Sequence, residues 1–221
     1  MPNSNTYKLS FLVLILVLLV CFFTNISLGS VYIPVKDVFN SLIGSANAQE
    51  TWQHIIQNYR LPKAITAILV GSGLGISGLL MQTLLRNPLA GPFVLGISSG
   101  ASLGVALVIL GSSVFGGIFV SVLISKWSIV IAASLGSFLV LLAVLMVSIK
   151  VRDTMAILII GLMFASITAA IVSVLSYFGS AQQLQQYIFW GFGSLGNLSW
   201  DELFIFFIIY SLGIIVSLTS V

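Results

Sequence analysis

The sequence predicts an all-α protein, a polytopic bundle of membrane-spanning helices, and three observations support that class. Of its 221 residues, 59% are hydrophobic, and the mean hydropathy is +1.19. Only 6% are charged, whereas an average soluble domain has about 25% charged residues. The few charges stand between long apolar windows. Because they cannot cover a surface that faces water, a soluble globular enzyme is excluded.

Charge and metal-ligand counts exclude two further classes. The net charge of +3 rests on eight Lys and Arg residues, too few for the basic stripe of a nucleic-acid binder. One cysteine, Cys21, and one histidine, His54, cannot supply a disulfide framework or a zinc site of three or four ligands. We therefore expect no metal ion and no cofactor. His54 follows Glu50 by four residues, and we interpret the two as a solvated pair.

Charge-free windows locate the spans. A spanning helix needs about 20 apolar residues, because a bilayer core of about 30 Å is crossed at about 1.5 Å per residue. A charge at the helix centre costs about 2.5 to 3.5 kcal/mol. The windows predict six spans in one transmembrane domain over residues 1–221, at about 9–29, 62–85, 93–110, 127–149, 155–178 and 203–221.

The first span has one alternative. Lys8 followed by the apolar stretch 11–23 also fits a secretory signal peptide. The cleavage sites are poor, because Ser27-x-Gly29 is weak and no small residue stands well placed before Cys21. We therefore favour a retained span.

The second span is predicted to begin at Pro62, since proline suits the first position of a helix. Arg60 and Lys63 then lie at the positive end of the helix dipole, where cations are unfavourable. A local rule broken at a membrane surface indicates an anionic partner. Lipid phosphate and an acidic protein both fit.

The third span is short because prolines interrupt the window before it. Pro88 and Pro92 lie four residues apart in the segment 87–92, and each biases its preceding residue away from the helical region. We expect a turn there. Apart from Arg86 it carries no charge, which is unusual for a solvated loop, so it is a candidate to pack against a transport pathway.

A short interfacial helix is predicted at about 182–195, between the fifth and sixth spans. Four glutamines precede Tyr187, Phe189 and Trp190 there, and amphipathic aromatic side chains prefer the membrane interface.

Small residues recur every four positions in three of the spans. In lipid, such rows let helix backbones approach closely, so they predict a tightly packed bundle. The same glycines produce the spacing G-x-G-x-x-G at 73–78, but inside an apolar span this is not a dinucleotide site. The rows are Ala67, Gly71 and Gly75; Gly96, Gly100 and Gly104; and Gly161, Ala165, Ala169 and Ser173.

Charges leave the orientation open and argue against one kind of carrier. With the N-terminus inside, four Lys and Arg residues fall on each side of the membrane, so the positive-inside count is a tie. The five Asp and Glu residues all lie at span ends or in loops. Proton- or sodium-coupled carriers usually have such residues within their spans.

Residues 60–104 resemble a known signature. They read RLPKAITAILVGSGLGISGLLMQTLLRNPLAGPFVLGISSGASLG, with an R-L-P-K start, Gln82 at the end of a glycine-rich helix, N-P-L-A-x-P at 87–92 and G-x-S-S-G-A at 96–101. A second block contains Gln183-Leu184, Phe189-Trp190, Gly193-Ser194-Leu195 and Trp200. Together they resemble the FecCD-type permeases, the membrane subunits of ATP-driven importers for iron-siderophores, haem and cobalamin.

The resemblance implies a set of partners. Such permeases have about ten helices, form homo- or heterodimers in the bacterial cell (inner) membrane, and bind two cytoplasmic ATPase subunits. An extracytoplasmic substrate-binding protein docks through acidic residues on basic permease residues, here Arg60 and Lys63. The permease is then not an enzyme, because ATP is hydrolysed on the separate ATPase subunits.

The resemblance also implies a pathway. The turn at Asn87 and Leu89, with Arg152 and Thr154 beside it, forms the cytoplasmic gate. The fifth span lines the pathway with Gly161, Ala165, Ala169 and Ser173, and the segment 182–195 caps it on the outer side.

The length differs from the family pattern. Family members are longer than about 300 residues, so we expect either a truncated chain or a partner chain that supplies the remaining helices. An energy-independent channel or carrier and a non-transporting membrane anchor stay open as alternatives. Iron chelate is the default cargo, with haem, siderophores and cobalamin not distinguished.

Overall fold

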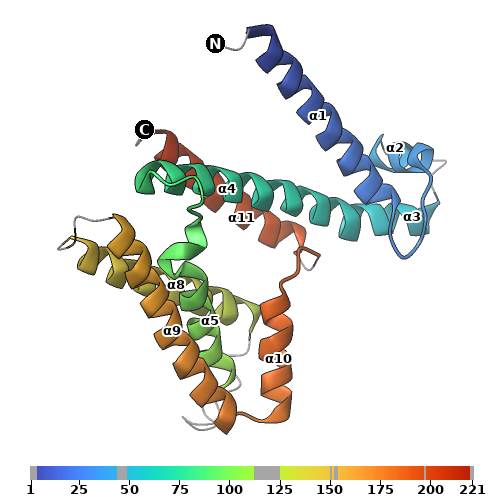
Figure 1. Cartoon of the computed structure of the whole chain (residues 1–221). Helices are drawn as coiled ribbons and strands as arrows, with labels where there is room; N and C mark the ends of the chain where they lie inside the picture. Colours follow the sequence, from blue (N-terminus) through green and yellow to red (C-terminus); the bar gives the residue numbers. More distant parts are fainter. Residues whose placement is uncertain are drawn as a thin grey trace. The chain divides into compact units, whose positions relative to one another are not determined.

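The protein is all-α in the part of the chain that the structure describes. This computed structural model describes residues 4–43, 49–111, 125–149, 151, 154–196 and 198–219, and these residues form helices and turns without a strand (Figure 1). In chain order the elements are α1 (Ser4–Ser27), α2 (Val35–Ile43), α3 (Glu50–Ile55), the π-helical turn η1 (Ile56–Arg60), α4 (Leu61–Leu85), the 3-10 turn η2 (Pro92–Leu95), α5 (Ile97–Ile109), α8 (Lys126–Ser148), α9 (Thr154–Phe178), α10 (Ala181–Phe192) and α11 (Trp200–Thr219).

Five of the described helices are long and apolar enough to cross a bilayer. They are Tyr7–Ser27, Glu50–Leu85, Lys126–Ser148, Ala156–Phe178 and Trp200–Thr219. The helix expected at about 93–110 consists of η2 followed by α5, which has 13 residues and rises about 20 Å at 1.5 Å per residue. It is therefore shorter than the hydrocarbon core of about 30 Å. The predicted class, a polytopic membrane helix bundle, is confirmed.

The chain divides into two compact units, and α4 contributes to both. One unit comprises Met1–Gly73 with Ser194–Val221, and the other comprises Leu74–Gly193.

The first unit has its core where α1 ends. The apolar side chains of Ile26, Ile33, Val38, Ile56 and Ala64 form a buried cluster there. Phe23 of α1 stacks on Phe39 of α2, with ring centroids 4.7 Å apart. Figure 1 shows α2 and α3 beside this end of α1. The short helices therefore close one end of the first unit.

The second unit is built around α5, which contacts α8, α9 and α10. Val105, Ala106, Ile109 and Leu110 form one buried cluster, and Leu95, Val140 and Val144 form another. Since α5 lies between these neighbours, its glycines are placed where backbones can meet.

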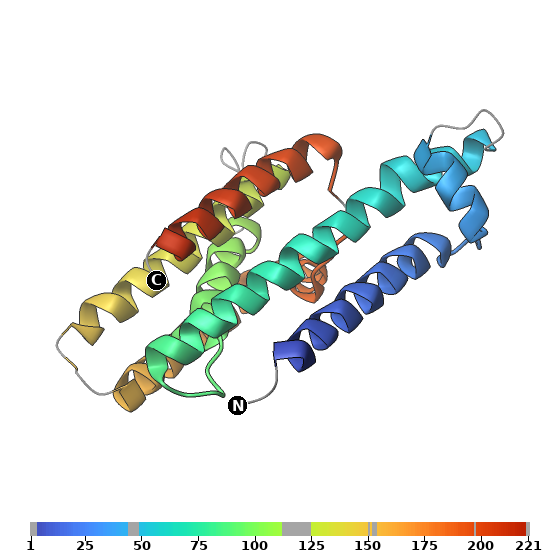
Figure 2. The same ribbon diagram turned by 90° about the horizontal axis from the view of Figure 1, so that it is seen from above.

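The second predicted span differs from expectation at its start. Helix α4 begins at Leu61, but it continues from α3 and η1 without a break, as the continuous ribbon in Figure 2 shows. Pro62 is thus inside a helix, and the prediction that it occupies a helix start is wrong. The dipole argument for Arg60 and Lys63 does not apply.

The π-helical turn explains how a proline fits inside this helix. A proline ring clashes with the carbonyl four residues earlier and donates no N–H. In η1 the N–H of Leu61 donates to the carbonyl of Ile56, five residues back, which frees the carbonyl of Gln57. The indole N–H of Trp200, at the start of α11, donates to that carbonyl at 3.0 Å. The wide turn thus accommodates Pro62 and joins α11 to this helix.

Helix α10 folds back beside α5 (Figure 1). Its start is a capping box, in which Ser180 accepts from the amide of Gln183 at 3.3 Å and the Gln183 side chain accepts from the amide of Ser180 at 2.9 Å. Tyr187 and Trp190 stack on each other and pack on the α5 cluster. The predicted helix therefore exists in the sequence region expected, and the position of 182–195 at a membrane interface stays a prediction.

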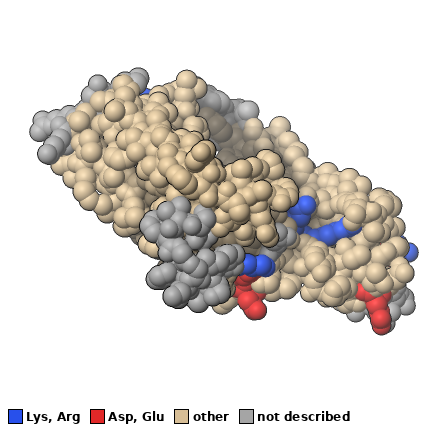
Figure 3. Space-filling view, turned by 90° about the horizontal axis from the view of Figure 1, so that it is seen from below, with Lys and Arg blue, Asp and Glu red and all other residues tan. Residues whose placement is uncertain are grey.

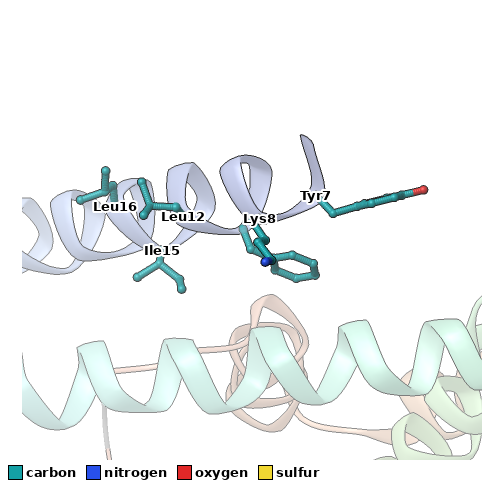
Figure 4. A pocket seen from close by; sticks show the side chains of 6 residues that line it. Tyr7, Lys8, Leu12, Ile15 and Leu16 are labelled. Atoms are coloured by element: carbon teal, nitrogen blue, oxygen red, sulfur yellow. The ribbon is translucent and has the colours of Figure 1, made fainter. Parts of the chain in front are cut away.

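The surfaces of the long helices are apolar. Every residue of α1 from Tyr7 to Cys21 is exposed, and Figure 4 shows Leu12, Ile15 and Leu16 following Tyr7 and Lys8 along it, around a hollow that residues of α1 alone line. Figure 3 shows a face on which few charged atoms interrupt an otherwise uncharged surface. Such exposed apolar area is unusual for a soluble monomer and indicates a multi-pass membrane protein.

Candidate functional site

The two basic residues expected to dock a partner face opposite ways. Arg60 is 8% exposed, with Ile56 before it and Ala64 after it also buried. Lys63 is exposed, as is Tyr59 one turn earlier. One helix therefore turns Arg60 into the first unit and Lys63 out of it. The expectation that both cations present their charge at the surface holds for Lys63 alone.

The Arg60 guanidinium is held by backbone carbonyls. Its Nη1 donates to the carbonyls of Ile26 at 2.6 Å and Ser27 at 2.9 Å, and its Nη2 donates to that of Val31. A buried charge is costly unless it is hydrogen-bonded, and these bonds supply that compensation.

The turn between α4 and η2 has the geometry that its sequence requires. Arg86 has a positive φ of 47°, and the side-chain oxygen of Asn87 accepts from the amide of Leu89 at 2.9 Å. This is an Asx turn, a motif that asparagine forms readily. Leu89 is 87% exposed, whereas Ala90 is 5% exposed. The side chain of Leu89 therefore projects from the turn, whereas the neighbouring Ala90 is packed against the rest of the protein.

The remaining predicted gate residues are only partly described. Thr154 is the first residue of α9, and its side chain lies outside the described part, as does the whole of Arg152. The predicted grouping of these two residues with Asn87 and Leu89 therefore lies outside the described residues and stays a prediction.

The row predicted to line a pathway on α9 splits into a packed and an open part. Gly161 is buried, and a Cβ placed there would lie 3.1 Å from Cα of Leu95 and against the carbonyl of Val94. Ala165 is half-buried, whereas Ala169 and Ser173 are exposed. The lack of a side chain at Gly161 thus lets η2 pack closely on α9. Ala169 and Ser173 are the exposed part of the row, and they are the residues left for a pathway to contact.

The row predicted on α5 lies at a close helix contact. A Cβ at Gly100 would lie 2.5 Å from the carbonyl oxygen of Gly136 in α8, and one at Gly104 would overlap the carbonyl of Ala132. Gly96 has a φ of 75° and packs near Val140. These contacts are what a small-residue row provides in lipid.

The row predicted on α4 does not lie at such a contact. No described atom lies within 4 Å of a Cβ built at Gly71 or Gly75. Ala67 and Gly71 instead line an open groove of about 460 Å³ with Leu18, Cys21 and Asn25 of α1. The predicted close packing at these two glycines is wrong for the described chain, because small size permits a contact without supplying its partner.

Several structural residues were not predicted. Ala132, Gly136 and Val140 complement α5, and their four-residue spacing in the sequence is the signal that could have indicated them. Ser137 donates to the carbonyl of Ile97 at 3.0 Å. Ser102 and Tyr187 are hydrogen-bonded across α5 and α10, and no sequence spacing indicates that pair.

The described residues at these positions offer surfaces for contact with other molecules. Among the described residues, no group of three or more His, Cys, Asp or Glu side chains could hold a metal ion. The geometry provides an exposed cation, Lys63, on the long helix that contains α4, a projecting turn at Leu89 and exposed small residues on α9.

Comparison with known proteins gives these features a context. The FecCD transport family matches residues 16–221. The chain is 34% identical over 198 residues to the hemin transport system permease protein HmuU of Yersinia pestis, covering 89% of this chain and 56% of that protein. It is 31% identical over 193 residues to the vitamin B12 import system permease protein BtuC of Klebsiella pneumoniae, covering 87% of this chain and 53% of that one.

A solved structure shows the same fold. A metal-chelate type ABC transporter in an inward-facing conformation superposes with a TM-score of 0.75 and 26% identity, covering 93% of this chain and 60% of that chain. The chain thus spans a little over half the length of the relatives it matches. Its family match covers nearly all of its own residues, and the chain belongs to the FecCD transport family.

Proposed function

We propose that the chain provides the transmembrane permease subunit, or the N-terminal part of one, of a binding-protein-dependent ABC importer. The observation that carries this is the family match over residues 16–221. The five long apolar helices among the described residues, with little charge within them, support a subunit that surrounds a pathway. Its cargo is an iron chelate, a siderophore or haem, or cobalamin, and iron chelate is the first choice.

The partners follow from that function. ATP is hydrolysed on two separate cytoplasmic ATPase subunits, so this chain is not an enzyme. A second permease subunit completes the pathway, and an extracytoplasmic substrate-binding protein delivers cargo. The assembly resides in the bacterial cell (inner) membrane.

Lys63 is the docking cation in this proposal. Its exposure on the outward face of the helix, next to exposed Tyr59, supports contact with an acidic partner surface. Rim charges of this kind chiefly set association rate and its salt dependence.

The gate is assigned to the turn at Asn87 and Leu89, with Arg152 and Thr154 as its neighbours. The Leu89 side chain is 87% exposed and projects from an Asx turn. An exposed apolar side chain at this position supports the assignment of the turn to the gate. Ala165, Ala169 and Ser173 line the pathway, and the small size of these residues leaves room for bulky cargo.

The test is uptake into proteoliposomes. The permease is reconstituted with its ATPase and substrate-binding protein, and entry of a ferric siderophore, haemin and cobalamin is measured with and without ATP. We expect uptake of one cargo class that requires both ATP and the binding protein. Uptake without ATP would instead support an energy-independent channel or carrier. No uptake of any cargo by a correctly assembled complex would support a membrane anchor.

A further inference from the structure

The short helix α2 (Val35–Ile43) has an apolar face that the core of its unit covers along one edge only. Val38 is buried in the cluster at the end of α1. Ile43, by contrast, is 78% exposed, and three further large apolar side chains beside it are exposed as well. These exposed residues form the α2 stripe, which consists of Val35, Phe39, Leu42 and Ile43.

The polar residues of α2 lie on its other side. At about 100° per residue, the α2 stripe fills an arc of about 100° around the helix, and Asp37 lies about 160° from both Val35 and Phe39. Asn40 stands between Asp37 and the stripe on this wheel. Such segregation is typical of a helix that lies along a membrane surface, with its apolar face toward the acyl chains. Helix α2 therefore has one side suited to lipid and one side suited to water.

The length of α1 places the start of α2 at the edge of the hydrocarbon core. The apolar segment Tyr7–Ser27 has 21 residues, and it rises about 31 Å, close to the hydrocarbon thickness of about 30 Å. Its end at Ser27 therefore lies near the headgroups. The amide of Ile33 donates to the carbonyl of Ser27 at 3.1 Å, and the hydroxyl of Ser27 donates to the carbonyl of Ile33 at 2.6 Å. The connector thus returns to the end of α1 before α2 begins.

One ring contact sets the depth of the α2 stripe. The ring of Phe39 stacks on that of Phe23 in α1, with centroids 4.7 Å apart and planes inclined by 27°. Phe23 precedes Ser27 by four residues, which is about 6 Å along the helix. Phe39 therefore lies on the acyl-chain side of the end of α1. Interfacial helices bury their apolar face to a similar depth, about 5 to 10 Å.

The apolar surface of α1 continues through the connector onto the stripe. Residues Tyr7–Cys21 are all exposed, and the connector adds the exposed side chains of Leu28, Val31 and Tyr32. Figure 1 shows α2 beside this end of α1. Tyrosine prefers the interface between membrane and water, which suits Tyr32 at this level. Lipid alone therefore accounts for the exposed apolar residues of α1, the connector and α2.

We propose that the α2 stripe is a lipid-binding surface, which rests in the boundary between acyl chains and headgroups of the leaflet where α1 ends. The buried Val38 ties α2 to the core of its unit, and the Gln57 side chain donates to the carbonyl of Ser41 at 3.3 Å, which ties α2 to η1. Helix α2 thereby holds this end of the unit at the membrane surface. The role requires a membrane protein and is independent of the cargo.

Spin labels measure the depth of the stripe in a bilayer. Cys21 is the only cysteine of the chain, so single cysteines are introduced into a C21S background and labelled with a nitroxide. V35C and I43C report on the stripe, D37C is the matched control on the opposite side of α2, and L14C is the lipid control on α1. In nanodiscs, power-saturation EPR compares collisions with O₂, which concentrates in lipid, and with a nickel chelate, which stays in water.

The ratio of O₂ to nickel collisions distinguishes the possible surroundings of the stripe. We expect ratios at V35C and I43C at least about threefold above that at D37C and below that at L14C, because the stripe enters only the boundary region. Nickel collisions as frequent as at D37C would show that the stripe faces water and would overturn the proposal. Few collisions with either reagent would show that protein covers the stripe and would overturn it equally.

A charge placed on the stripe gives a second test that leaves the core intact. I43D changes an exposed side chain, and N40D adds the same charge on the polar side. With the label at V35C, we expect I43D to lower the collision ratio toward the D37C value, since a charge in the apolar part of the boundary is costly. N40D should leave the ratio unchanged. Equal effects of the two variants, whether a loss or none, would contradict lipid binding by the stripe.

Two features keep these results interpretable. The L14C label in the I43D and N40D backgrounds reports whether α1 still spans the bilayer, so misfolding is recognised as a loss of depth at position 14 as well. The measurements need neither ATP nor the substrate-binding protein. A failure of lipid binding by α2 is therefore distinguishable from a failure of transport.

Discussion

At the scale of single residues, the surroundings of each glycine decide whether a side chain there would be destabilising. Gly104 and Gly71 are both helical and both belong to small-residue rows, but a Cβ at Gly104 meets the backbone of Ala132, whereas one at Gly71 meets no described atom within 4 Å. Backbone atoms cannot move aside as the end of a flexible side chain can. The two positions therefore form a matched pair.

We expect G104A to destabilise the protein and G71A to be neutral or stabilising. Overpacking costs about 1 to 3 kcal/mol, whereas alanine is up to about 1 kcal/mol better than glycine inside a helix. Thermal unfolding of the two variants in detergent measures the difference. A lower midpoint for G71A than for G104A would contradict the packing described for α5 and α8.

Charge at Lys63 has a separate expected effect. The substitution K63E should slow association with an acidic partner several-fold at low salt and reverse the salt dependence, because screening then relieves repulsion. Stopped-flow association at two ionic strengths measures it, with K36E, an exposed lysine of α2, as the control. Equal rates for K63E and wild type at both salt concentrations would leave lipid phosphate as the better partner of this lysine.

At the scale of elements, hydrogen bonds between neighbouring helices fix short segments. Ser102 and Tyr187 join α5 to α10, and Trp200 joins α11 to the freed carbonyl of Gln57. Interhelical hydrogen bonds in membrane proteins contribute about 0.6 kcal/mol on average. Each of these contacts is therefore modest, and the packing around it sets the position of the helix.

The hydrogen-bonded pair of Ser102 on α5 and Tyr187 on α10 gives a further prediction. Y187F and S102A should each lower stability by about 0.5 to 1 kcal/mol, and the double variant should cost no more than either one, because both remove the same bond. A double-mutant cycle on thermal unfolding in detergent measures the coupling. Fully additive effects would show that the two hydroxyls do not stabilise the α5–α10 contact together.

At the scale of the whole molecule, the exposed apolar helices require lipid. Residues Tyr7–Cys21 are all exposed, as are large parts of α8, α9 and α11. We expect the protein to remain with the membranes after alkaline carbonate treatment and to need detergent for extraction, which immunoblotting of the fractions measures. Release into the supernatant as a water-soluble monomer would contradict the membrane assignment.

Sequence reasoning succeeded where the physical cause is local. Windows without charge locate α8, α9 and α11 because inserting a charge into lipid is costly at any point of a span. The turn after α4 follows from Pro88 and Pro92, and the asparagine at 87 forms the Asx turn expected of its residue type. Sequence reasoning failed at Pro62, which was predicted to begin a helix. A π-helical turn accommodates the proline inside the helix, and the indole of Trp200 donates to the carbonyl that this turn frees.

The sequence by itself determined the class of the protein and the approximate position of its spans, because the free energy of placing side chains in lipid depends on residue type and not on neighbours. Only the tertiary structure decided which small residues touch and which cation is buried. Arg60 reaches carbonyls 29, 33 and 34 residues away, and Gly100 faces Gly136 of another helix. Such contacts depend on how distant segments meet, which no local pattern records.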